Sequence, residues 1–183
     1  MSEEDREFWD GKHARSLLAP VIQPPPAPPL FAHVEDHFPT EGRALGIACG
    51  RGEGAVWLAS RGLEYRGVDV SPVAIEMARS LVEAYGFEDR CRLEVWDLDR
   101  GLPPGDQVDV LFCHMFRDPR LYEPMIERVA PGGLIAVAVL SEVGGKRGDF
   151  RARPGELADA FGHLDVLDQG EGDGVARLLA LRM

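Results

Sequence analysis

Apolar stretches of strand length alternate with amphipathic stretches of helix length from residue 43 onward. Short apolar or alternating runs predict strands, and apolar residues at every third or fourth position predict helices. The pattern predicts strands over 43–48, 64–70, 90–96, 107–113, 134–140, 163–168 and 175–181, and helices over 53–61, 72–85, 119–129 and 154–161. Strands and helices that alternate in this way form a parallel sheet with helices on both faces.

The last two predicted strands are joined by the glycine-rich turn 170–174, which is too short to hold a crossover helix. They are therefore expected to pair as an antiparallel hairpin. The fold class that follows is α/β, a Rossmann-like open sheet of seven mostly parallel strands with a C-terminal hairpin and helices on both faces. Residues 141–153 are expected to form a mobile loop at the carboxyl edge of the sheet, where ligands of such folds bind.

The first 39 residues lack this alternation and are predicted to form a flap and a connector, leaving 40–183 as the main domain. Residues 2–18 place Phe8 and Trp9 among charges, which predicts one or two short amphipathic helices over the active site. The proline-rich segment 20–29 must be extended, since proline fixes φ and lacks an N–H donor. A stiff connector is favoured over a recognition motif, because no arginine flanks the prolines closely.

Composition narrows the functional classes. The chain has 183 residues, 45% hydrophobic and 28% charged, which fits one globular domain. Its net charge of −11 disfavours nucleic acid and anionic membranes as partners. Three scattered cysteines without a CxxC pair predict free thiols and no metal site. With no signal peptide and no apolar run of membrane-spanning length, a cytoplasmic location is expected.

The strongest local motif is ALGIACGRGEG at 44–54, between the first predicted strand and helix. Glycines at Gly50 and Gly52 let the backbone approach a ligand, and the helix N-terminus favours an anionic group. Asp69 ends the second strand, where a carboxylate can accept hydrogen bonds from ribose hydroxyls. Asp97 and Leu98 end the third strand and suit an adenine, although a solvated turn explains them equally well. These residues predict an adenosine-type ligand and leave open an NAD-binding oxidoreductase.

Taken together, the motifs resemble the class I S-adenosylmethionine-dependent methyltransferases over residues 43–183. The matching segments are 45–52, 68–71, 97–98, 108–111 and 131–133. A finer similarity, at Asp149-Phe150-Arg151, is to the tellurite-resistance and thiopurine methyltransferase branch. The resemblance implies S-adenosylmethionine as cofactor, S-adenosylhomocysteine as product and a small-molecule acceptor. It assigns cofactor binding to nine residues: Ala48, Cys49, Gly50, Gly52, Asp69, Val70, Asp97, Leu98 and Cys113.

Two positions depart from the family pattern. Gly46 stands where the family usually has an acidic residue that helps to orient the methionine amino group, and Ala48 stands where it usually has glycine. These departures motivate a further alternative, a non-catalytic protein that binds S-adenosylmethionine without turnover.

The methyl acceptor is expected to approach the end of the fourth strand. His114 is the candidate general base there. In the alternative interpretation, only the backbone of His114 contacts the cofactor, and the imidazole has no catalytic role. Met115 and Phe116 are candidates for an apolar acceptor pocket or for ordinary core packing. Trp9 and His13 of the flap are expected to complete the pocket. The chain is expected to be a monomer or a homodimer, with no metal.

Overall fold

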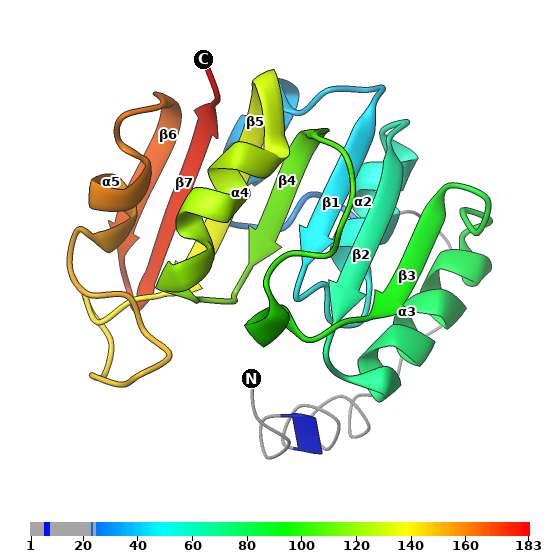
Figure 1. Cartoon of the computed structure of the whole chain (residues 1–183), viewed down its shortest axis with the longest axis horizontal. Helices are drawn as coiled ribbons and strands as arrows, with labels where there is room; N and C mark the ends of the chain where they lie inside the picture. Colours follow the sequence, from blue (N-terminus) through cyan, green and yellow to red (C-terminus); the bar gives the residue numbers. More distant parts are fainter. Residues whose placement is uncertain (1–5, 8–22, 24) are drawn as a thin grey trace.

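The computed structural model describes residues 6, 7, 23 and 25–183, and these residues build one seven-stranded sheet (Figure 1). The strand order is β3-β2-β1-β4-β5-β7-β6. Strands β1 to β5 run parallel, and β7 pairs antiparallel with both β5 and β6. The predicted fold class is thereby confirmed. The strands are β1 Arg43–Ile47, β2 Glu64–Asp69, β3 Cys91–Val95, β4 Val108–His114, β5 Val129–Leu140, β6 Asp165–Gly172 and β7 Val175–Leu181.

The order of the strands fixes where a ligand can bind. The chain leaves β1 toward β2 and β3 on one side, and returns to β4 on the other side. The crossovers therefore diverge between β1 and β4, which opens a crevice at their carboxyl ends. The glycine loop and His114 both lie at this edge.

Helices cover the two faces unevenly. Helices α2 (Glu53–Ser60) and α3 (Pro72–Ala84) pack with the 3₁₀ helix η1 (Ala32–His37) on one face. Helices α4 (Tyr122–Arg128) and α5 (Glu156–Phe161) pack on the other face, in front of the sheet in Figure 1. Two further 3₁₀ turns are η2 (Leu98–Arg100) and η3 (Pro119–Leu121).

The start of α3 shows how local chemistry fixes an element. The hydroxyl of Ser71 accepts a hydrogen bond of 3.0 Å from the backbone N–H of Ala74, which satisfies a donor at the start of the helix. Pro72 follows at the first helical position, where its missing N–H costs nothing. The helix predicted over 72–85 is confirmed, and it begins directly after this capping residue.

Three predicted boundaries were wrong. Residues 119–121 form η3 and not the start of α4, because Asp118 caps Arg120 through its side chain. The strand predicted over 134–140 begins earlier, at Val129, so that residues 131–133 lie inside β5, where the backbone N–H of Gly132 donates to the carbonyl of Arg182. Strand β6 extends to Gly172, so the hairpin turn is only Asp173-Gly174.

The described part of the N-terminal connector packs into the core, which the sequence did not predict. Phe31 is completely buried, and its ring lies 5.8 Å from that of Phe112 in β4. Phe38 stands edge-on to Trp57 of α2, with ring centroids 4.8 Å apart. Residues 27–38 thus cover the sheet beside α2, and Phe31 also reaches the ring of His114 at 6.5 Å.

Candidate functional site

The glycine loop joins β1 to α2 at the carboxyl edge. Ala48 and Gly50 have φ values of +48° and +55°, and Gly52, with φ +91°, precedes the first residue of α2. A side chain at Gly52 would place its Cβ 2.9 Å from the Cβ of Ala78 in α3. Glycine therefore allows the loop to pack directly on α3, and the left-handed residues turn the backbone sharply over the end of the sheet.

Asp69 holds this loop in place. Its Oδ2 accepts a hydrogen bond of 2.9 Å from the N–H of Gly50, and its Oδ1 accepts one of 2.9 Å from the N–H of Ser71. The side chain is 7% exposed. Each carboxylate oxygen has two lone pairs and can accept more than one hydrogen bond. The structure brings together the loop and the acid that the sequence singled out.

The residues after β3 divide between the core and the surface. Leu98 is 2% exposed and packs in the core cluster that includes Val68. Val70 is also buried, at 7% exposure. Asp97 is half-buried, and its Oδ1 accepts from the N–H of Asp99 at 3.0 Å. The carboxylate of Asp97 is thus the polar group available here, whereas the side chain of Leu98 serves the core.

His114 ends β4 in an apolar setting. Its ring stacks on Phe112, with 4° between the planes and 6.0 Å between the centroids. Within the described part of the chain, its Nε2 is buried and has no hydrogen-bond partner. Burial lowers the pKa of His114, and the nearby carboxylate of Glu53 opposes this shift. The imidazole is therefore neutral at pH 7 and keeps a free ring nitrogen.

Cys113, the residue before His114, is not a nucleophile. It is 1% exposed, and burial raises the pKa of its thiol to about 12. Its Sγ donates to the carbonyl of Phe116 at 3.3 Å. Burial also raises the pKa of Cys49 in the glycine loop well above its ordinary value. Both thiols are neutral at pH 7, and neither is activated for attack.

Met115 and Phe116 follow β4 and present apolar surface. Met115 has a φ of +65°, and its side chain is 40% exposed. A non-glycine residue in this left-handed region costs on the order of 1–3 kcal/mol, and such strain gathers at functional sites. Phe116 is half-buried against the core. The methionine is thus the more accessible of the two.

An ion-pair network beside this edge was missed in the sequence. Arg117 donates to both carboxylate oxygens of Glu156, from Nε and Nη2, at 2.7 Å each. The hydroxyl of Tyr122 donates to Glu156 at 2.8 Å, and Nη1 of Arg117 donates to the carbonyl of Asp149 at 2.9 Å. The hydrogen bonds to Glu156 raise the pKa of Arg117. The network ties the loop 141–153 to the end of β4.

Tyr65 also had no signal in its own sequence neighbourhood. A Cβ built at Gly46 would lie 1.7 Å from the Oη of Tyr65, so the tyrosine ring fills the space beside this glycine. Tyr65 is 2% exposed, and burial raises its pKa well above the ordinary value. The only hint in the sequence is a glycine within a central strand, which often marks a close approach by another group.

Two residues that were predicted to complete the acceptor pocket, Trp9 and His13, lie outside the described residues. Among residues 6, 7, 23 and 25–183, no group of three or more His, Cys, Asp or Glu side chains is arranged to hold a metal ion. The same part of the chain has no helix with the length and apolar character needed to cross a membrane.

The lowered pKa of His114 gives a stability prediction. A histidine whose pKa is lower in the folded state binds its proton more readily when unfolded. Acid therefore favours the unfolded chain below about pH 6.5, the ordinary histidine value. We expect urea unfolding to show a steeper loss of stability from pH 7 to pH 5 in the wild type than in His114→Phe. Equal slopes would contradict the lowered pKa.

The chain is similar to known proteins over most of this site. Residues 44–133 match the model of a family described as a methyltransferase domain. The methyltransferase GfsG from Streptomyces halstedii is 30% identical over 102 residues, which are 52% of this chain and 37% of GfsG. The chain therefore spans well under two thirds of the length of GfsG. The matched family segment includes the glycine loop, Asp69 and His114.

Solved structures share the fold at low sequence identity. TehB from Haemophilus influenzae superposes with a TM-score of 0.71 at 16% identity, covering 97% of this chain and 67% of TehB. Geranyl diphosphate C-methyltransferase from Streptomyces coelicolor A3(2) superposes with a TM-score of 0.72 at 14% identity, covering 98% of each chain. At these identities the likeness shows the fold.

Proposed function

Because the chain belongs to the class I S-adenosylmethionine-dependent methyltransferases, we propose that it transfers the methyl group of S-adenosylmethionine to a small-molecule acceptor. One observation carries this proposal. The carboxylate of Asp69 is hydrogen-bonded to the N–H of Gly50, so the acid and the glycine loop form one unit at the crevice between β1 and β4. The alternative of an NAD-binding oxidoreductase gains no support from the matched family.

The residues of this unit fit the cofactor. The carboxylate of Asp69 suits the vicinal hydroxyls of a ribose, which donate hydrogen bonds to such a group. Asp97 lies at the end of β3, where it would accept from the adenine amino group. The backbone of Cys49 to Gly52 would hold the methionine end. The bound cofactor supplies a methyl group already activated on a sulfonium, so the protein mainly positions the acceptor and excludes water.

The acceptor would lie beside His114. The unpartnered Nε2 of a neutral imidazole can accept a proton from an acceptor thiol, hydroxyl or amine as the methyl group is transferred. Exposed Met115 offers an apolar contact, and Phe150 on the loop 141–153 is 71% exposed at the same edge. These residues favour an acceptor with an apolar body. Geranyl diphosphate C-methyltransferase, which shares the fold, is named for a small-molecule acceptor, and GfsG is named as a methyltransferase.

A binding measurement tests the cofactor assignment. Calorimetric titration with S-adenosylhomocysteine should show one saturable site with micromolar affinity, whereas NAD should not bind. Binding of NAD alone would favour the oxidoreductase. Binding of S-adenosylhomocysteine without transfer to any acceptor, beginning with a panel of thiols, would favour the non-catalytic alternative.

Removing the base should affect turnover more than binding. We expect His114→Gln to lower kcat about 10²-fold, the ordinary contribution of a general base, with the affinity for S-adenosylhomocysteine within about twofold. His163→Gln, which changes an exposed histidine outside the site, is the matched control. Turnover equal to that of the control would leave His114 with a backbone role only.

The N-terminal flap stays a proposal. If Trp9 and His13 help to cover the site, deletion of residues 1–18 should lower turnover or weaken binding of S-adenosylhomocysteine. Unchanged values of both would contradict the flap. The connector that follows packs beside His114 through Phe31, so the deletion should stop before it.

A further inference from the structure

One face of strands β1, β2 and β3 has no helical cover within the described residues. Helices α2 and α3 pack on the opposite face, while the crossover from β3 to β4 contains only the three residues of η2 and an extended loop. Figure 1 shows α4 and α5 in front of the other half of the sheet. The bare face holds a hollow of about 560 Å³ near the amino ends of these strands, away from the glycine loop.

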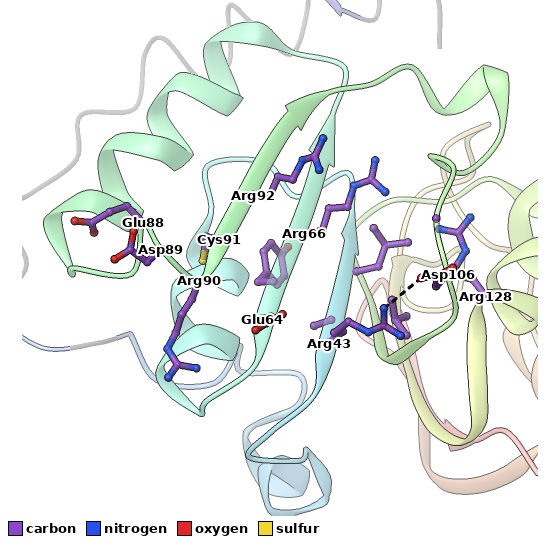
Figure 2. Close-up of a pocket in the computed structure, with 15 residues that line it drawn as sticks. Arg43, Glu64, Arg66, Glu88, Asp89, Arg90, Cys91, Arg92, Asp106 and Arg128 are labelled. Atoms are coloured by element: carbon purple, nitrogen blue, oxygen red, sulfur yellow. Dashed lines mark ion pairs between the residues drawn. The ribbon is translucent and has the colours of Figure 1, made fainter.

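Arginines from three separate elements meet in this hollow. Arg66 of β2 and Arg92 of β3 extend side by side from neighbouring strands, and Arg128 from the end of α4 lies across from them (Figure 2). The crossover loop holds two of these side chains with consecutive carbonyls. Nη1 of Arg66 donates to Pro104 at 2.6 Å, and Nη2 of Arg128 donates to Pro103 at 2.7 Å.

Two of these three arginines share a single carboxylate. Glu94 accepts from Nε and Nη2 of Arg66 at 2.9 and 2.8 Å and also pairs with Arg92, so one carboxylate serves two guanidinium groups. Arg128 has no ion pair with a described residue, and its hydrogen bond goes to a neutral carbonyl. Burial and the neighbouring Arg66 lower the pKa of Arg128, and the carboxylate of Asp106 opposes this shift. A negative charge beside it would relieve this repulsion.

Asp106 supplies part of that charge, but it is shared with Arg43. Asp106 lies 3.6 Å from Arg43 and is mostly exposed. Glu88 and Asp89 stand at the opposite end of the hollow, beyond β3, as Figure 2 shows. Five arginines line the hollow: Arg43, Arg66, Arg90, Arg92 and Arg128. Four carboxylates line it with them: Glu64, Glu88, Asp89 and Asp106. The hollow is therefore much less acidic than the chain as a whole, which carries a net charge of −11.

We propose that this hollow is a second ligand site, in which Arg66, Arg92 and Arg128 bind the phosphate group of a small molecule. A phosphate accepts several charge-assisted hydrogen bonds at once, and guanidinium groups match it in shape and charge. The volume suits a small molecule. The strong negative charge elsewhere on the chain disfavours a polyanion such as RNA. The site is independent of the proposed methyl transfer.

Calorimetric titration of the full chain with pyrophosphate, at constant ionic strength, tests the proposal. The wild type should bind one pyrophosphate per chain. Arg128→Gln should weaken this binding about tenfold or more, as expected for the loss of a charged hydrogen-bonding partner. Arg147→Gln, which removes the same charge from the loop 141–153, is the matched control and should bind within about twofold of the wild type.

Thermal unfolding of each variant separates lost binding from lost folding. If Arg128→Gln fails to fold, Arg92→Gln replaces it, because that side chain is 74% exposed and needs only Glu94. No saturable binding by the wild type, or equal weakening in the variant and the control, would overturn the site. Binding of a polyglutamate peptide without binding of pyrophosphate would also overturn it, in favour of an acidic protein partner.

Discussion

Replacing Asp69 with alanine is expected to weaken the binding of S-adenosylhomocysteine about tenfold or more, which corresponds to about 1.4 kcal/mol. The carboxylate is the group proposed to hold the ribose, and it also fixes the loop that would hold the methionine end. Its two hydrogen bonds go to Gly50 in the loop and to Ser71 before α3. The substitution therefore removes a ligand contact and loosens the loop around the cofactor.

The same substitution should also lower stability. Hydrogen bonds to charged groups contribute roughly 1.5–3 kcal/mol each, and Asp69 accepts two from backbone N–H groups. We expect urea unfolding to show a loss on the order of 2–4 kcal/mol. Added S-adenosylhomocysteine should raise the free energy of unfolding less in the variant than in the wild type, because at a given concentration a more weakly bound ligand stabilises the folded state less.

Asp109→Ala is the matched control for Asp69→Ala. Asp109 begins β4 at the opposite edge of the sheet, and its Oδ2 accepts from the backbone N–H of Arg43 at 2.7 Å. It should lose stability without losing affinity for S-adenosylhomocysteine. If both variants weaken binding equally, the effect of Asp69 is a general consequence of instability, and the ribose assignment is wrong.

The sequence predicted the parts of the fold that local chemistry determines. Alternation of strands and helices fixed the class, and Ser71-Pro72 marked the start of α3. Asp69 and the glycine loop could be paired from their order alone, since both follow parallel strands that end at one edge. The boundary of β5 was wrong because Gly132 is held by Arg182, a partner distant in the sequence.

The missed features depend on contacts between distant residues. Arg117 and Glu156 are 39 positions apart, and nothing near either residue indicates the other. Phe31 and Phe112, whose rings pack together, are likewise far apart in the sequence. The arginine hollow exists because the crossover from β3 to β4 has no long helix, and its residues come from separate strands and from the end of α4. Spacing rules carry no information of this kind.

Gly46→Asp, which restores the acidic residue usual in the family, is expected to destabilise this chain severely. The new Cβ would lie 1.7 Å from the Oη and 2.4 Å from the Cζ of Tyr65. The ring cannot move aside freely, because it is 2% exposed and packs against Gly67. Overpacking of this kind costs about 1–3 kcal/mol, and an unpaired buried carboxylate adds to the cost. We expect urea unfolding to show a loss above about 3 kcal/mol.

Gly148→Asp is the control, because a Cβ at this glycine meets nothing within 4 Å, and its stability should stay within about 0.5 kcal/mol of the wild type. Adding Tyr65→Ala to Gly46→Asp should recover part of the loss, with a coupling energy of about 1 kcal/mol or more. Recovery would show that the absence of an acidic side chain at position 46 and the presence of Tyr65 depend on each other. The acidic residue usual in the family is then absent because the ring of Tyr65, from β2, fills the space that it would need. Additive losses would mean that Gly46 is required for a reason other than Tyr65.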